Sequence, residues 1–218
     1  MQENHIDIRK SARYYTLGAL NDNTSEVWFI LHGYAQLAKD ILQKFEELNN
    51  DNIYFIAPEG LNKFYSRGFA GNPVASWMSS EDRMNEIKDY CNYLNQLFLY
   101  FELDKKPNIK INVLGFSQGV TTASRWIVSN DFSFHHFVLY AGEIAKEFQE
   151  ELPSKLGNIP STIVRGRNDS LIKEERIKSI IDLYKNTPHQ YIEFEGGHEV
   201  TSEMAEMILK SRTIKIVT

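Results

Sequence analysis

The chain has 218 residues, of which 42% are hydrophobic, and its 24 basic and 29 acidic side chains give a formal net charge of −5. A chain of this length and composition can bury one substantial core, so we expect a single α/β domain over residues 1–218. The small acidic excess provides no electrostatic footprint for nucleic acid or an acidic membrane surface. No apolar run reaches the ~18 residues of a membrane-spanning helix, so membrane insertion is not expected either.

The first residues and the cysteine content indicate the compartment. Residues 1–10 mix charged side chains with isoleucines and contain no unbroken apolar core of the signal-peptide type. Cys91 is the only cysteine, which excludes an intrachain disulfide and suits a reducing environment. We expect a cytoplasmic protein in which Cys91, at helical spacing from Ile87 and Leu94, is a buried apolar residue and not a reactive thiol.

The first part of the chain predicts an edge strand followed by a parallel βαβ unit. Residues 11–20 are expected to form a strand at the antiparallel edge of the sheet. The apolar run 27–31 predicts a buried strand that leads directly into a loop beginning at His32. A helix over 41–48 and a strand over 53–57 follow.

Residues 59–80 contain three glycines and one proline without sustained periodicity, and they predict a long functional loop. Ser79 and Asp82 predict a capping box at the start of a long helix that is expected to end near Pro107. The predicted apolar face of that helix comprises Met84, Ile87, Cys91, Leu94, Phe98 and Phe101.

The rest of the chain continues the alternation of strands and helices. Strands are predicted over 109–114, 137–140, 162–165 and 190–194, and helices over 120–129, 177–184 and the segment after residue 198. The charged segment 143–155 is expected to lie on the surface. Loops that follow parallel strands at their carboxyl ends build the ligand site in such sheets.

One of these strand-to-helix junctions carries the strongest functional signal. Gly115-Phe116-Ser117-Gln118-Gly119 has the spacing of a nucleophile elbow, in which a serine on a tight turn projects its hydroxyl above the sheet. The glycines allow neighbouring backbones to approach, and the helix dipole directs its positive end at the hydroxyl. The alternative is an ordinary corner with a solvated serine, and the preceding strand and following helix favour the nucleophile.

A serine hydroxyl needs a base, usually a histidine oriented by a carboxylate, to become a nucleophile at neutral pH. Asp169 and His198 lie in the loops after two successive predicted strands. The order Ser117, Asp169, His198 is the chain order of folds built on this elbow. The tetrahedral intermediate also needs two backbone N–H donors, and we expect them from Gln118 and Tyr34.

The other histidines are weaker candidates for the base: His5, His32, His135, His136 and His189. His5 lies in the N-terminal arm, and the last three precede strands, so surface or edge positions are expected for them. His32 is at the correct end of its strand, where we expect it to brace the loop by hydrogen bonds. None of the five shows metal-ligand spacing.

The choice of the acid has alternatives as well. Asp182 falls among exposed positions of a predicted helix, where a solvated side chain is the default. Asn168-Asp169-Ser170 is ordinary turn chemistry that needs no catalytic role. The position of Asp169 after a core strand and before the His198 loop nevertheless favours it as the acid.

Six motifs occur in the order found in one known family: Leu31-His32-Gly33, Ala57-Pro58, Ala75-Ser76-Trp77, Gly115-Phe116-Ser117-Gln118-Gly119, Gly166-Arg167-Asn168-Asp169 and Gly197-His198. Over residues 26–210 the chain resembles the small carboxylesterase/phospholipase group of α/β-hydrolases, which includes acyl-protein thioesterases and bacterial carboxylesterases. The resemblance implies the α/β-hydrolase fold, with a mostly parallel central sheet, helices on both faces and no large lid domain. It also implies the triad Ser117, Asp169 and His198.

Three departures from the family pattern bear on the substrate. Tyr34-Ala35 replaces the usual Leu-Gly, Val120 replaces a frequent glycine, and Ser170 stands where proline is common. Trp77 matches a family position near the acyl pocket. Phe69, Trp77 and Met78 either line an apolar slot for the substrate or pin the 59–80 loop to the domain.

The sequence predicts a serine esterase that hydrolyses carboxylic ester or thioester bonds of short to medium acyl substrates through an acyl-serine intermediate. The expected partner is a small-molecule acyl ester or thioester, with no nucleic acid, no metal and no organic cofactor. A monomer or homodimer is expected. Two alternatives remain, a non-catalytic ligand-binding homologue and an acyltransferase or lyase that uses the same elbow.

Overall fold

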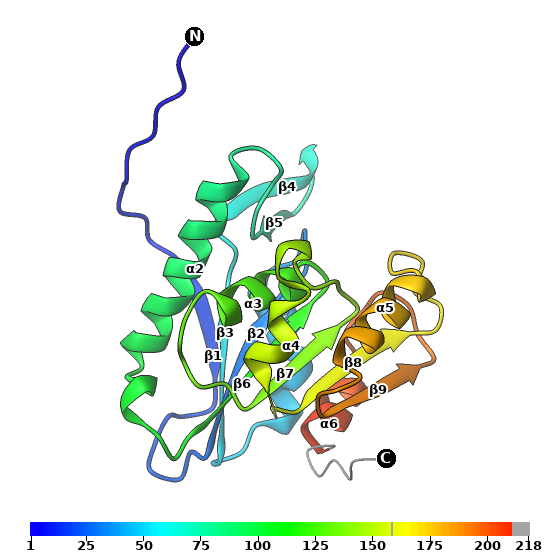
Figure 1. Ribbon diagram of the computed structural model, residues 1–218. Coiled ribbons are helices and arrows are strands. Elements are labelled where there is room, and N and C mark those ends of the chain that lie inside the picture. Colours follow the sequence, from blue (N-terminus) through cyan, green and yellow to red (C-terminus); the bar gives the residue numbers. More distant parts are fainter. Residues whose placement is uncertain (158, 211–218) are drawn as a thin grey trace.

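The computed structural model describes residues 1–157 and 159–210, and its centre is a sheet of seven strands (Figure 1). The spatial order is β1-β3-β2-β6-β7-β8-β9, with β1 antiparallel to β3 and the other neighbouring pairs parallel. The strands are β1 Tyr14–Leu17, β2 Glu26–Leu31, β3 Ile53–Pro58, β6 Lys110–Phe116, β7 His136–Tyr140, β8 Ser161–Gly166 and β9 His189–Phe194. This arrangement confirms the predicted fold class, including the antiparallel edge strand.

Helices cover both faces of the sheet, and the described part of the chain shows no large lid (Figure 1). Side chains of α2, α3, α4 and α5 join the core on one face, and those of α1, η1 and α6 join the core on the other. The elements are α1 Ala38–Leu42, η1 Gln43–Leu48, α2 Arg83–Tyr100, η2 Leu103–Lys105, α3 Gln118–Val128, η3 Lys146–Phe148, α4 Glu151–Leu156, α5 Glu174–Tyr184 and α6 Ser202–Lys210. Within the described residues, no helix has the length and apolar character needed to cross a membrane.

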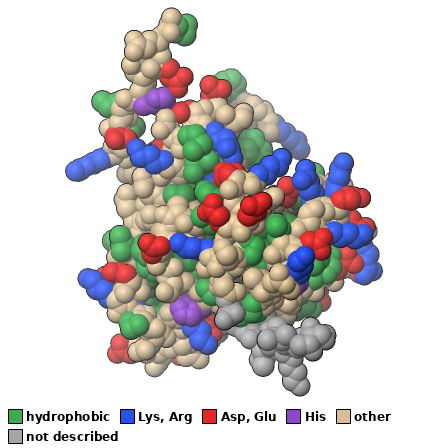
Figure 2. Space-filling view, in the orientation of Figure 1, with side chains coloured by type: hydrophobic (Ala, Val, Ile, Leu, Met, Phe, Trp, Pro, Cys, Tyr) green, Lys and Arg blue, Asp and Glu red, His purple; other side chains and the backbone are tan. Residues whose placement is uncertain are grey.

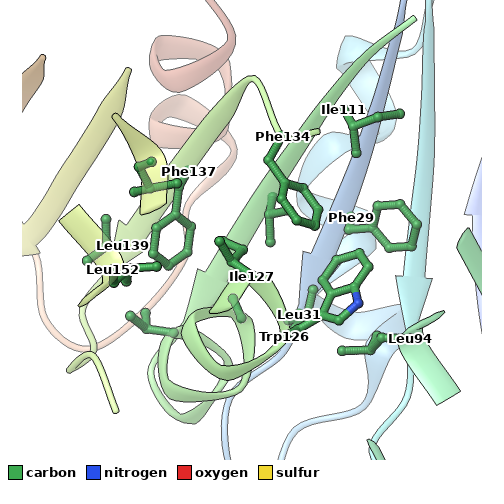
Figure 3. Close-up of a cluster of buried hydrophobic side chains, with 14 of the residues drawn as sticks. Phe29, Leu31, Leu94, Ile111, Trp126, Ile127, Phe134, Phe137, Leu139 and Leu152 are labelled. Carbon is green, nitrogen blue, oxygen red and sulfur yellow. The ribbon is translucent and has the colours of Figure 1, made fainter. Parts of the chain in front are cut away.

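The larger core lies between the central strands and α3. Successive side chains of a strand point to opposite faces, so Phe29 of β2 enters this core while its neighbour Trp28 enters the other. Trp126 of α3 packs edge-on against Phe29, with ring centroids 4.9 Å apart, and lies among the apolar side chains drawn in Figure 3. Its indole N–H donates to Asn95 Oδ1 at 2.8 Å, so the one polar atom of this buried side chain is satisfied.

The predicted loop 59–80 contains a β-hairpin, which the sequence reading missed. Its strands are β4 Asn62–Phe69 and β5 Pro73–Ser76, paired in antiparallel fashion outside the main sheet. Most of β4 is exposed, so its residues lack the apolar alternation that identifies a half-buried strand. Gly68 supplies the left-handed backbone, at φ 57°, that the hairpin turn needs.

The start of α2 also differs from the expectation. Asp82 precedes the helix with a left-handed φ of 49° and makes no side-chain cap, so the predicted capping box is absent. The Ser79 N–H and hydroxyl donate instead to the Glu86 carboxylate, one turn further into the helix. Met84, predicted on the apolar face, is exposed, whereas Cys91 is buried as expected.

Two segments predicted at the surface are partly or wholly buried. Within 143–155, Ile144, Ala145 and Leu152 enter the core, because η3 and α4 fold back over α3. His136 is buried at the start of β7, with Nε2 2.8 Å from Thr162 Oγ1.

On the face drawn in Figure 2, acidic and basic side chains are interspersed.

The packing around Trp126 predicts a large loss of stability on truncation. Trp126→Ala removes a fully buried indole and should lower the free energy of unfolding by about 3–5 kcal/mol. Urea unfolding measures the change, with Leu99→Ala on the exposed side of α2 as the control at under about 0.5 kcal/mol. Equal effects of the two substitutions would contradict this description of the core.

Candidate active site

Ser117 lies between the end of β6 and the first residue of α3, in a strained backbone conformation. Its φ is 53°, in the left-handed region that a residue with a side chain rarely adopts. The turn is possible because glycines surround it. A Cβ on Gly119 would lie 2.2 Å from the Leu31 carbonyl oxygen, and one on Gly142 would lie 2.4 Å from the Ser117 carbonyl oxygen. The elbow predicted from the sequence is therefore formed.

Asp169 and His198 meet at the carboxyl ends of β8 and β9. His198 Nδ1 lies 2.8 Å from Asp169 Oδ2, and the carboxylate is fully buried while the imidazole is 17% exposed. Asp169 Oδ1 accepts two more hydrogen bonds, from the N–H groups of Leu171 at 2.8 Å and Ile172 at 3.1 Å. A carboxylate can only accept, so Nδ1 carries the proton and Nε2 is left with its lone pair as a base.

Backbone contacts fix the Asp169 and His198 loops to each other and beside the elbow. The Asn168 N–H donates to the Gly196 carbonyl at 2.9 Å, and a Cβ on Gly166 would lie only 2.3 Å from the Gly197 carbonyl oxygen. The His198 ring contacts the ring of Phe116, the residue before Ser117, with centroids 5.0 Å apart. Within the described residues the Ser117 hydroxyl makes no hydrogen bond. Hydrogen bonds between a catalytic serine and its base are often long or poorly aligned without substrate and tighten when substrate binds.

The loop after β2 packs directly on the elbow. A Cβ on Gly33 would lie 3.2 Å from Ser117 Cβ and 3.1 Å from the Phe116 ring. The Gly60 N–H donates to His32 Nε2 at 2.9 Å, so Nδ1 carries the imidazole proton and donates to the Gly33 carbonyl at 2.7 Å. His32 therefore braces this loop with both ring nitrogens, as its position beside Gly33 predicts.

This brace also orients the next N–H group. The Gly33 carbonyl and the Tyr34 N–H belong to one planar trans peptide and point in opposite directions. With the carbonyl held by His32, the Tyr34 N–H is fixed on the other side of the peptide. Gln118 is the first residue of α3, so its N–H has no partner within the helix. Ala35 takes a left-handed φ of 57°, where the resembling family has glycine.

Trp77 packs against the loop after β2. It is 1% exposed, its ring stacks on His32 at a centroid distance of 5.0 Å, and its indole N–H donates to the His32 carbonyl at 2.8 Å. Phe69 is fully exposed. It lies seven residues along β4 from Asn62, which pairs with Ser76, so the length of the strand places Phe69 about 20 Å from Ser76 and its neighbour Trp77. The structure thus does not bring Phe69, Trp77 and Met78 together as a slot, and Trp77 has the alternative role of pinning the loop.

The Gln118 side chain is a feature that sequence reasoning missed. Its amide oxygen accepts from the Ser76 hydroxyl at 3.2 Å and the Trp77 N–H at 3.1 Å, and its Nε2 donates to the Met78 carbonyl at 2.9 Å. The residue after Ser117 thus fastens the segment 76–78 to the elbow. The sequence signal that could have indicated this role is a polar side chain at the start of a buried helix.

Two further supporting residues carry no sequence motif. The Gln36 amide oxygen accepts from the Gly33 N–H at 2.9 Å. Glu59, adjacent to Gly60, is a buried carboxylate that accepts from Arg13 Nε at 2.8 Å. Both become recognisable only when the chain is folded, because their partners come from distant or irregular segments.

Among the described residues, one group of side chains has donor atoms close enough to share a metal ion: Glu3, His5 and Asp82. All three are exposed and belong to the N-terminal segment and the start of α2. None of them is part of the predicted triad or of the loop after β2.

The crowding at the elbow predicts that glycine 119 is required for folding. Gly119→Ala should lower the free energy of unfolding by about 3 kcal/mol, because the added methyl group would overlap backbone carbonyl oxygens that cannot move aside. Urea titration measures the effect. Gly197→Ala is the matched control, since a Cβ there meets no atom within 4 Å. A Gly119→Ala protein as stable as the control would show that the elbow is looser than described.

The buried histidine predicts a specific pH dependence of stability. Burial lowers the pKa of His32 from 6.5 to about 4. Between these values the unfolded chain binds a proton that the folded protein does not, so stability is complete above pH 6.5 and falls as the pH drops towards 4. The contribution is about 3 kcal/mol, and His136, whose pKa burial also lowers to about 4, adds a similar loss.

Urea unfolding of His32→Gln and wild-type protein across this pH range tests the assignment. The variant should lose part of the acid dependence while His5→Gln, which removes an exposed histidine, keeps all of it. Identical pH profiles for His32→Gln and wild type would contradict it.

Comparison with known proteins places this geometry in a family. Among solved structures, acyl-protein thioesterase 2 of Zea mays is 19% identical, with a TM-score of 0.68 over 93% of this chain and 98% of that chain. A carboxylesterase of Mesorhizobium loti is 13% identical (TM-score 0.66, 85% and 88% covered), and a phospholipase/carboxylesterase of Dyadobacter fermentans is 15% identical (0.64, 91% and 94%). These likenesses show the shared fold. No curated protein sequence matches the chain.

The family follows from the sequence match. The model of the serine hydrolase (FSH1) family matches residues 24–206, which include the elbow, the loop after β2 and the Asp169 and His198 loops. With the structural neighbours, this match confirms the predicted resemblance to the α/β-hydrolase group of esterases and thioesterases. The chain belongs to the FSH1 family of serine hydrolases.

Proposed function

We propose that this serine hydrolase cleaves carboxylic ester or thioester bonds of small acyl substrates through an acyl-serine intermediate, with Ser117, Asp169 and His198 as its triad. The observation that carries the proposal is the Asp169–His198 hydrogen bond beside the strained Ser117 turn. The esterases and thioesterase among the structural neighbours support ester and thioester substrates. A cytoplasmic location and a monomeric or dimeric state stay predictions.

In the first half-reaction, His198 Nε2 accepts the Ser117 hydroxyl proton as Oγ attacks the acyl carbon. Asp169 keeps the proton on Nδ1 and stabilises the imidazolium that forms. Because three hydrogen bonds hold the carboxylate, it stays in place while the charge on the imidazole changes.

The negative charge that develops on the carbonyl oxygen meets two backbone donors, the N–H groups of Tyr34 and Gln118. The His32 brace orients the first and the helix start positions the second, so neither has to reorganise during the reaction. Each such donor typically contributes about 3 kcal/mol to transition-state stabilisation. His198 then protonates the leaving group, activates a water molecule, and the acyl-serine is hydrolysed.

A short p-nitrophenyl ester tests the triad. Ser117→Ala should abolish turnover, and Asp169→Asn should lower kcat by about 10⁴, because an amide cannot hold the correct histidine tautomer. Asp182→Asn is the matched control, since Asp182 is an exposed residue of α5, and it should retain wild-type kcat.

Labelling with a fluorophosphonate probe tests the nucleophile without a substrate. Intact mass and peptide mapping should show one adduct on Ser117, formed much more slowly in His198→Ala. Wild-type turnover by Ser117→Ala, or an adduct on another residue, would overturn the mechanism.

A further inference from the structure

A pocket of about 320 Å³ opens beside the elbow, along one side of α3. Gln118, Thr121 and Arg125 line it from the helix. They are three and four residues apart, so they form one stripe that leads away from Ser117. The stripe spans about 10 Å at the rise of an α-helix. Met78 lines the same pocket.

The far end of the pocket contains a buried cation. The Arg125 side chain is 4% exposed, and its Nε donates to Glu147 Oε1 at 2.9 Å. Its Nη1 donates to the Tyr90 hydroxyl at 3.1 Å and contacts Met78 Sδ at 3.2 Å. The remaining nitrogen, Nη2, donates to no group in the described part of the chain, and Arg125 is one of the residues that line the pocket.

Positive charge exceeds negative charge around this pocket. Arg83, Arg125 and Lys146 line it together with Glu143 and Glu147. Glu147 pairs with two arginines, because Arg83 Nη2 lies 3.1 Å from Oε1, the same oxygen that accepts from Arg125. Glu143 has a cation of its own outside the pocket lining, Arg176, at 3.7 Å.

Arg125 therefore keeps its charge in a place where water is largely excluded. Burial lowers the pKa of the guanidinium, but the hydrogen bonds to Glu147 and Tyr90 outweigh it and raise the pKa overall. A charge buried with free donors is stabilised by an anion that reaches it. Arg83 and Lys146 are more exposed and lie on the path by which such an anion would enter.

We propose that this pocket holds a carboxylate at the distal end of the acyl chain, so that the preferred substrates are half-esters or half-thioesters of dicarboxylic acids. The inference rests on the proposed function and adds the substrate class. The ~10 Å stripe suits an acyl chain of about six to eight carbon atoms between the ester carbonyl and Arg125. Hydrolysis of such a half-ester consumes one water molecule and yields the alcohol, the dicarboxylate and one proton.

Matched substrates test the preference. Mono-p-nitrophenyl suberate carries the free carboxylate, and its methyl ester has the same chain without the charge. We expect wild-type protein to favour the charged substrate by about tenfold in kcat/KM at low salt, and the preference to shrink as salt screens the pocket mouth.

Variants of the mouth connect the preference to this pocket. Arg83→Gln combined with Lys146→Gln should reduce the ratio of the two kcat/KM values by at least about fivefold. Arg125 is left in place, because its loss would remove a buried side chain that bonds both Glu147 and the Tyr90 hydroxyl. Lys155→Gln makes the same kind of charge change on α4, outside the pocket, and should leave the ratio unchanged. A wild-type ratio near one, or a ratio that survives in the double variant, would overturn the proposal.

A binding measurement separates this inference from the proposed function. In Ser117→Ala protein, calorimetry should detect saturable binding of suberate that exceeds that of octanoate and is lost in the Arg83→Gln, Lys146→Gln background. If wild-type protein turns over no ester, the proposed function fails, but suberate binding still shows whether the pocket holds a carboxylate. Equal binding of suberate and octanoate would refute the carboxylate site even in an active esterase.

Discussion

The architecture depends on one strained residue at the junction of β6 and α3. A left-handed φ at Ser117 is unfavourable for a residue with a side chain, so the surrounding structure must hold the turn in place. It does so by close backbone packing, in which Gly119 lies against the end of β2 and Gly142 against the Ser117 carbonyl. The central strands, α3 and the loop after β2 therefore meet at Ser117, the proposed nucleophile.

The loop after β2 is held by a buried network of side-chain and backbone hydrogen bonds. His32, Trp77, Gly60 and the Gly33 carbonyl are joined by hydrogen bonds that use their polar atoms in a buried environment. Such a network is rigid because any displacement would leave a polar group without a partner. This rigidity fixes the Gly33–Tyr34 peptide, whose N–H is one of the two proposed oxyanion donors.

The strands and the predicted triad followed from sequence because their signals are local. The run before Gly115 and the order of Ser117, Asp169 and His198 depend on neighbouring residues and on chain order, and the structure brings Asp169 and His198 together. The hairpin β4–β5 was missed because exposed strands lack apolar alternation. His136 was misplaced because a strand start says little about which strands flank it, and the role of Arg125 arises only when η3 folds back over α3.

Gln118 combines two duties that place different demands on a residue. Any amino acid would supply the main-chain N–H that is the proposed oxyanion donor, whereas the side-chain amide accepts from the Trp77 N–H and donates to the Met78 carbonyl. The amino-acid identity at this position is therefore determined by the loop it fastens and not by the chemistry beside it. Over evolutionary time, residue 118 and the segment 76–78 should change together, and a substitution on one side would need a compensating change on the other.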